Sequence, residues 1–146
     1  MTGSVRNAAR RSQQGVAAIE FALVFSTLLV FLYGIATFGS VFYTQQAVSR
    51  AAEDGARALT AFNGPVTSDT ITAVKSVIYD SLSTSLVGPS NATQAQRKTW
   101  LQSNLTVNVD ATGLVRVTYP YDRSRLLNLS ESWVPTTIVG RAQIAL

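Results

Sequence analysis

The sequence lacks the residue types on which most hydrolases and metal sites depend. It contains no cysteine and no histidine, which excludes disulfides, thiolate nucleophiles and the two commonest ligands of transition metals. The G-x-S-x-G and S-x-x-K patterns of serine hydrolases are missing as well, and so is the D-x-D/N-x-D/N-G pattern of calcium loops. We therefore predict that the protein is not an enzyme and uses no metal, no cofactor and no small-molecule substrate.

Charge is also scarce, because only 14% of the residues are charged, fewer than is usual for a soluble globular domain. The formal net charge is +4, but Arg6, Arg10 and Arg11 supply most of the excess, and the rest of the chain carries 9 basic and 8 acidic residues. A chain with so little remaining positive charge lacks the basic surface that phosphate backbones require. The composition therefore predicts no nucleic-acid partner.

An uncharged segment near the N-terminus determines the class of protein. No residue from 21 to 49 is charged, and residues 21–33 read FALVFSTLLVFLY, a sequence that is apolar on every face of a helix. About 20 such residues cross the ~30 Å hydrocarbon layer of a membrane, and residues 16–38 supply them. The alternative is a buried core helix, but the rest of the chain is too short to enclose one. We predict a single transmembrane helix, assigned to residues 16–43.

The flanks of this segment predict its orientation. Arg6, Arg10 and Arg11 precede the span and no basic residue follows it immediately, and basic residues in short loops stay on the cytoplasmic side. The N-terminus is therefore expected in the cytoplasm and everything after about residue 43 across the membrane. A cleaved secretory signal peptide has an apolar part of only 7 to 15 residues, roughly half the length of this run.

Glu20 does not fit a simple anchor. A carboxylate near the centre of the hydrocarbon layer costs about 2.5 to 3.5 kcal/mol, and less toward the interface, so intramembrane acids are functional candidates. Alternatively, Glu20 lies at headgroup depth, where a negative charge in the first turns of the helix is favoured by the helix dipole. The chemistry of the residue leaves both interpretations open.

Residues 11–23, RSQQGVAAIEFAL, resemble the processing site of type IV prepilins, and most closely that of the TadE-like pseudopilins of tight-adherence secretion systems. Residues 34–58 continue in a similar way, with small residues and an AAEDGAR ending. The resemblance implies cleavage after Gly15 by a membrane prepilin peptidase, which would make Val16 the mature N-terminus and Glu20 its fifth residue. Glycine suits that position because it lets another backbone approach closely.

The resemblance also implies a role for the glutamate. Cleavage would leave a cationic α-amine on Val16, one helical turn from Glu20, and either the same chain or a neighbour could neutralise it. In pilins generally, the pairing with a neighbour is thought to set the axial register of the subunits. The major pilins of these systems usually carry tyrosine after the glutamate, whereas this chain has Phe21, which favours the pseudopilin class.

The implied function is structural: a minor pilin or pseudopilin used in assembling a Flp-type adhesion pilus. The implied partners are the bacterial inner membrane, the prepilin peptidase, other pilin or pseudopilin subunits and the pilus assembly platform, with the head in the periplasm. The alternative is an unprocessed, signal-anchored periplasmic domain that binds or scaffolds another membrane or secretion-system protein. The mature N-terminal residue distinguishes the two hypotheses.

The helix is expected to continue beyond the membrane over residues 44–63. It is expected to stop at the Asn-Gly-Pro sequence of residues 63–65. One of its faces carries small and apolar residues, which we expect to pack on the C-terminal domain of the same chain rather than on a partner helix. Two i, i+4 ion pairs are also expected, Arg50 with Asp54 and Glu53 with Arg57. The stripe consists of Val48, Ala51, Ala52, Gly55 and Leu59.

The remaining residues predict a mixed head. Ser68 is expected to cap a second helix with a stripe of Ile71, Val74, Ile78 and Leu82. A short helix is expected within residues 90–103, with Trp100 and Leu101 as its buried residues. Alternating apolar residues in 105–109 and 115–119 predict a β-hairpin. After a loop that contains Leu126, Leu127, Leu129 and Trp133, residues 136–146 are expected to form a third strand.

The predicted fold class is α+β: a long N-terminal transmembrane helix that continues into a small pilin-like head, with a second helix and an antiparallel sheet of three or more strands. Arg123, Arg125 and Arg141 are interpreted as solvated surface rather than as a binding patch. The predicted division of the chain is a cytoplasmic basic leader that is removed (1–15), a transmembrane helix (16–43), a membrane-proximal continuation (44–63) and an extracytoplasmic head (64–146).

Overall fold

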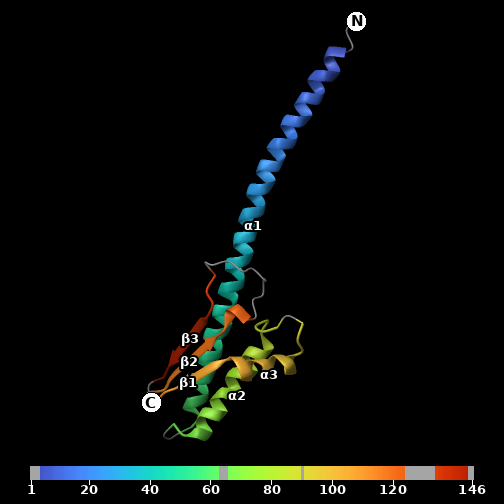
Figure 1. The fold of residues 1–146 in the computed structure, drawn as a ribbon. Coiled ribbons are helices and arrows are strands. Elements are labelled where there is room, and N and C mark those ends of the chain that lie inside the picture. The colour runs from blue at the N-terminus through green and yellow to red at the C-terminus, as the bar shows by residue number, and fades with distance from the viewer. Residues whose placement is uncertain (1–3, 63–65, 90, 124–133, 145–146) are drawn as a thin grey trace. The chain divides into compact units, whose positions relative to one another are not determined.

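The computed structural model describes residues 4–62, 66–89, 91–123 and 134–144, with side chains from residue 15 onward. In chain order, the elements are α1 (Ser4–Thr60), α2 (Ser68–Thr84), α3 (Gln94–Asn104), β1 (Thr106–Val109), β2 (Leu114–Tyr119), the 3-10 turn η1 (Tyr121–Arg123) and β3 (Ile138–Gln143) (Figure 1). These elements confirm the predicted α+β class. The chain forms two compact units, Met1–Phe38 and Gly39–Leu146.

The first unit consists of the N-terminal part of α1, and its apolar side chains are exposed. None of the residues in its most apolar stretch is buried within the protein, and the helix is long and apolar enough to cross a membrane. The hydroxyls of Ser26 and Thr27 donate hydrogen bonds to the backbone carbonyls of Ala22 and Leu23, at 2.7 and 2.9 Å. Because these hydroxyls find partners within the helix, they need none from lipid. The first unit is therefore a candidate membrane helix.

The second unit is built on the C-terminal part of α1, and the predicted small-residue stripe forms part of its core. All five members of the stripe are buried, and their neighbours come from the same chain, as predicted. The helix ends at Thr60, while the Asn-Gly-Pro sequence expected to stop it lies outside the described residues. The core that surrounds the stripe includes Val74, Ile78, Leu82, Leu101, Val115, Val117 and Tyr119.

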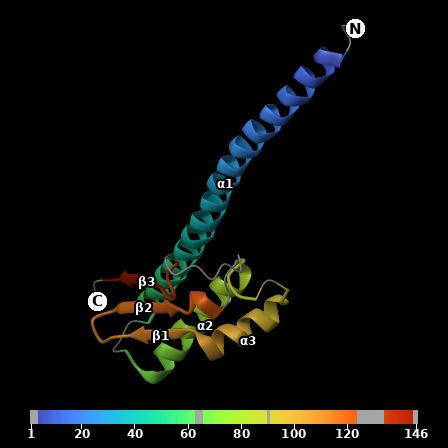
Figure 2. The same cartoon turned by 45° about the horizontal axis from the view of Figure 1, so that its top comes forward.

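Two glycines set how closely α1 approaches its neighbours. A Cβ atom added at Gly55 of α1 would lie 2.8 Å from the Cδ1 atom of Ile78 in α2. A Cβ atom at Gly140 of β3 would lie only 2.5 Å from the backbone carbonyl oxygen of Val48 in α1. Both distances are too short for a real side chain, so helix and strand meet backbone to backbone at Gly140. Accordingly, β3 lies beside α1 and β1 forms the far edge of the sheet (Figure 2).

The sheet is antiparallel with strand order β1-β2-β3, which confirms the predicted hairpin and third strand. Val107 pairs with Val117, and Val117 pairs in turn with Gly140, so alternate residues point into the core. The third strand covers Ile138–Gln143, so it begins later than the predicted residue 136 and ends before Ile144, while residues 145–146 lie outside the described residues. Thr136 instead accepts a hydrogen bond from the backbone N–H of Asp122 through its carbonyl, at 3.1 Å.

The helix starts differ from the prediction in their capping residues. Thr67, not Ser68, caps α2, because its side chain accepts the backbone N–H of Thr70 at 3.3 Å. The third helix, expected within residues 90–103, covers Gln94–Asn104 and starts at a capping box in which Thr93 and Gln96 satisfy each other's backbone N–H groups. Leu101 of α3 is buried, as predicted, while Trp100 is only partly buried and packs against the core. The four apolar leucine and tryptophan residues predicted in the loop before β3 lie outside the described residues.

The predicted ion pairs along α1 are wrong. Among the described residues the only ion pair joins Lys98 to Asp80, and neither Arg50 nor Arg57 is paired with a carboxylate. Asp54 instead accepts a hydrogen bond from the Ser81 hydroxyl of α2, at 2.8 Å. This contact joins α1 to α2.

The turn between β1 and β2 is held by one carboxylate. An Oδ1 atom of Asp110 accepts the backbone N–H groups of Thr112 and Leu114, each at 2.9 Å, and the Thr112 hydroxyl at 2.7 Å. Gly113 takes a φ of 77°, a left-handed conformation that favours glycine. The hydrogen bond from the Thr112 side chain, followed by that from the Leu114 backbone, holds the pKa of Asp110 below its usual value.

The first prediction tests the backbone contact at Gly140. We expect Gly140→Ala to destabilise the head by about 1 to 3 kcal/mol or more, because the new methyl group meets backbone that cannot rotate away. The measurement is urea unfolding of the full chain in detergent micelles, followed by near-ultraviolet circular dichroism. Gly39→Ala is the matched control, because a Cβ atom there meets nothing within 4 Å. Equal stability of the two variants would show that the close approach is not required.

The second prediction concerns the pH dependence that Asp110 introduces. Its pKa is lower in the folded state than the unfolded value of about 3.9, so its stabilising contribution is complete above that value and is lost as the pH falls through the folded pKa. We expect the difference in unfolding midpoint between wild type and Asp110→Asn to be constant near neutral pH and to shrink below about pH 4. A difference that stays constant into strong acid would contradict this role.

Candidate functional site

The residues that the sequence singled out lie along the N-terminal part of α1. Gly15 is inside the helix, and no heavy atom lies within 4 Å of the position that a Cβ atom would occupy. Val16 and Phe21 are 66% and 68% exposed. The peptide bond between Gly15 and Val16 is therefore uncovered by any described part of the protein. The backbone of Arg6, Arg10 and Arg11 belongs to the same helix.

Glu20 lies one turn after Val16 on the same face of α1, because residues four apart are neighbours on a helix. Its side chain is exposed, and no described residue forms an ion pair or a hydrogen bond with it. Next to it, the ring of Phe21 stacks on that of Phe25, with centroids 5.6 Å apart and planes 12° from parallel. A lone carboxylate thus sits beside an aromatic pair at the start of the apolar run.

Hydrogen bonds that were not predicted from the sequence join α1 to other elements of the second unit. The hydroxyls of Ser40 and Tyr121 are 2.9 Å apart and buried. Gln45 donates a hydrogen bond from Nε2 to the carbonyl of Val139 in β3, at 3.1 Å. These partners are separated by 81 and 94 positions in the sequence, so no local pattern could have identified them.

A further hydrogen bond closes the connection between α2 and α3. The Tyr43 hydroxyl accepts the backbone N–H of Leu86 at 3.1 Å. Tyr43 was expected at the end of the transmembrane helix, and the structure gives it this additional contact within the head. Tyrosine suits the boundary between an apolar span and a polar head, because its ring is apolar and its hydroxyl can form a hydrogen bond.

Two of the three arginines interpreted as solvated surface, Arg123 and Arg141, lie in described parts of the structure. Arg123 donates a hydrogen bond to the side chain of Asn104, at 3.0 Å, and Arg125 lies outside the described residues. Arg141 pairs across the sheet with Arg116, so that two exposed arginines stand directly opposite each other.

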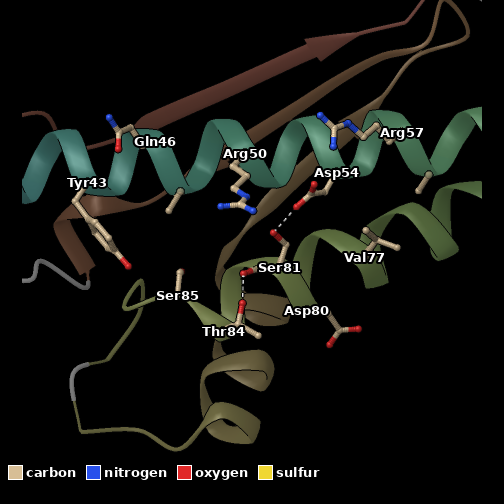
Figure 3. Close-up of a pocket in the computed structure, with 12 residues that line it drawn as sticks. Tyr43, Gln46, Arg50, Asp54, Arg57, Val77, Asp80, Ser81, Thr84 and Ser85 are labelled. Carbon is tan, nitrogen blue, oxygen red and sulfur yellow. Dashed lines mark hydrogen bonds between the residues drawn. The ribbon is translucent and has the colours of Figure 1, made fainter.

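A groove of about 1010 Å³ lies between α1 and α2 in the second unit (Figure 3). The packing of α2 against α1 makes its lining residues into a groove. Among the described residues, no group of three or more His, Cys, Asp and Glu side chains is placed to hold a metal ion. The groove is lined among others by Tyr43, Gln46, Arg50 and Arg57 of α1 and by Val77 and Asp80 of α2.

The comparison with protein families agrees with the resemblance noted in the sequence. Residues 15–57 match the family model described as TadE-like protein. The matched segment begins at Gly15, contains Glu20 and the candidate membrane helix, and extends through most of the small-residue stripe. No curated protein and no solved structure matches the chain significantly. Over residues 15–57, the chain is therefore similar to TadE-like proteins.

Proposed function

We propose that the protein is a structural minor pilin or pseudopilin, processed after Gly15 by a prepilin peptidase and used in assembling a Flp-type adhesion pilus. The TadE-like family suggests involvement in tight-adherence pilus systems and is not known as enzymatic. The observation that carries the proposal is the position of Gly15, Val16 and Glu20 at the start of a candidate membrane helix, inside the segment that matches this family.

The single apolar N-terminal helix suggests single-pass membrane anchoring, and the proposal adds an orientation and a compartment. The basic leader, with Arg6, Arg10 and Arg11, stays in the cytoplasm, and the head faces the periplasm across the inner membrane. In this division, residues 1–15 are removed, 16–43 span the membrane, 44–63 continue the helix and 64–146 form the head. The exposure of the bond after Gly15 supports access by a peptidase.

The mechanism of assembly follows from the chemistry of the new N-terminus. Cleavage leaves an ammonium group on Val16, about 6 Å along the helix axis from Glu20 at 1.5 Å per residue. In lipid, the two charges attract each other far more strongly than in water. Because no described residue pairs with Glu20, its carboxylate is available to the ammonium group of a neighbouring subunit. Such a pair would fix the axial position of one subunit against the next.

The partners that this role requires are the prepilin peptidase, other pilin or pseudopilin subunits and the pilus assembly platform. Phe21 stands where the major pilins of these systems usually have tyrosine, which supports a minor role in the fibre. The alternative, an unprocessed anchor for a scaffolding domain, requires neither a free amine on Val16 nor a carboxylate at residue 20. Sequencing the N-terminus of the protein from native membranes distinguishes the two.

The third prediction tests processing. We expect Gly15→Arg to leave an uncleaved protein that is still inserted in the membrane, because the apolar span is unchanged while the side chain blocks the scissile bond. Intact-mass measurement of the membrane-extracted protein reports the result. Gly3→Arg is the matched control, since it introduces the same residue into the leader away from the bond. Removal of the leader from Gly15→Arg as in wild type would exclude this cleavage site.

The fourth prediction tests assembly. We expect Glu20→Gln to insert at least as well as wild type, because the desolvation cost of the carboxylate disappears. Crosslinking to neighbouring subunits should fall by at least about tenfold, because a charge pair 4 Å apart contributes about 4 kcal/mol at an effective dielectric constant of 20.

Glu53→Gln provides the control for this experiment, because it makes the same change in the same helix outside the apolar segment. Crosslinking yield in membranes and pilus assembly in cells are measured for both variants. Full assembly by cleaved Glu20→Gln protein would show that the carboxylate serves only the helix start or the peptidase.

A further inference from the structure

Four charged residues line the groove between α1 and α2. The two acidic residues have a hydrogen-bond or ion-pair partner, whereas the two arginines have none among the described residues. The carboxylate of Asp54 accepts the Ser81 hydroxyl at 2.8 Å, and Asp80 forms the ion pair with Lys98. Within the described parts of the chain, neither Arg50 nor Arg57 has a carboxylate or a hydrogen-bond acceptor as its partner. The groove therefore presents two guanidinium groups without a direct hydrogen-bond acceptor, while the Asp54 carboxylate between them keeps its charge, because its Ser81 donor is neutral.

The geometry of α1 places these donors along one line. Tyr43, Arg50 and Arg57 are seven residues apart and all line the groove, and residues at this spacing share one face of a helix. The backbone positions of Arg50 and Arg57 lie about 10 Å apart along the helix axis, at 1.5 Å per residue. Figure 3 shows the Arg50 side chain reaching from α1 toward α2.

We propose that this groove binds an acidic helical segment of a different protein, whose carboxylates at positions i and i+7 pair with Arg50 and Arg57. A guanidinium group matches a carboxylate with two parallel hydrogen bonds. A helix laid along α1 repeats its acidic positions at the same interval as the two arginines. The apolar wall that Ala47 of α1 and Val77 of α2 supply would receive the small or apolar residues between these acids.

A second copy of this chain does not supply the required ligand. Its acidic residues are few, and no two of them lie seven positions apart in the sequence. The partner is therefore a different chain with a higher density of acidic residues on one helix face.

A membrane surface does not fit either, if the span ends at residue 43 as proposed above. Arg57 then lies about 21 Å further along α1, at 1.5 Å per residue, whereas the headgroup layer on each side of a bilayer is only about 5 to 7 Å thick. Lipid phosphates could not reach both arginines at once. A protein segment can, because it may lie along the helix at any distance from the membrane.

The experiment uses the full chain in zwitterionic detergent micelles and a fluorescein-labelled, alanine-rich peptide of about 18 residues, long enough to be helical, with glutamates at i and i+7. We expect fluorescence anisotropy to show that it binds at least about tenfold more tightly than the same peptide with glutamines, a difference of about 1.4 kcal/mol. Addition of about 0.5 M NaCl should weaken this binding, because salt screens exposed charge pairs.

Charge reversal locates the binding site. The double variant Arg50→Glu with Arg57→Glu should lose the preference for the glutamate peptide and gain one for a matched lysine peptide. Arg50→Gln with Arg57→Gln should also lose it, without added negative charge. The control is Arg116→Glu with Arg141→Glu, which makes the same change in charge on the sheet and keeps like charges opposite each other. Far-ultraviolet circular dichroism verifies that all variants are folded.

Four outcomes would overturn the proposal. The glutamate and glutamine peptides could bind equally, or the sheet variant could lose as much affinity as the groove variant. Anionic phosphatidylglycerol vesicles could bind in a manner that depends on Arg50 and Arg57 while the peptide does not, which would make the ligand a lipid surface. Self-association that is lost only in the groove variants would make the occupant a second copy.

Discussion

The head depends on how closely other elements can approach the C-terminal part of α1. At Gly140 the strand β3 lies so near the helix that a single added carbon would collide with the Val48 carbonyl, and at Gly55 the helix leaves room for Ile78 of α2. Strand and helix thus reach two sides of one helical surface. The buried stripe of small residues follows from the same requirement, because larger side chains would hold the sheet and α2 away from the helix.

The elements that could be predicted from the sequence are those specified by patterns among residues close together in the chain. The apolar run around the whole helix, the 3.6-residue period of α2 and the alternation in β1 and β2 are local patterns, and each predicted its element correctly. The capping box of Thr93 and Gln96 was equally local and was present in the sequence, so the start of α3 could have been predicted from it. Thr67 and Ser68 are adjacent hydroxyl residues, and the sequence alone does not decide which of them leaves the helix.

Contacts between distant segments could not be predicted in the same way. The Ser40 and Tyr121 hydroxyls meet only because β2 ends beside α1. Arg50 was expected to pair with Asp54 by helical spacing, but the described partner of the Asp54 carboxylate is Ser81 of α2. The register of β2 against β3, which places Arg116 opposite Arg141, depends on how the whole sheet is seated on the helix. The groove could not be predicted either, because it forms only where α2 packs against α1.

Because hydroxyl groups of the apolar helix bond within the helix, they do little to fix the axial position of a neighbouring helix. Ser26 and Thr27 each donate their hydroxyl to the carbonyl four residues earlier, so these side chains need no hydrogen-bond partner outside the helix. A surface of this kind is nearly the same at every depth and on every side, and a neighbouring apolar helix could slide or rotate along it at little cost. The carboxylate of Glu20 is the exception, because it is an exposed acidic group at the start of the apolar segment of α1.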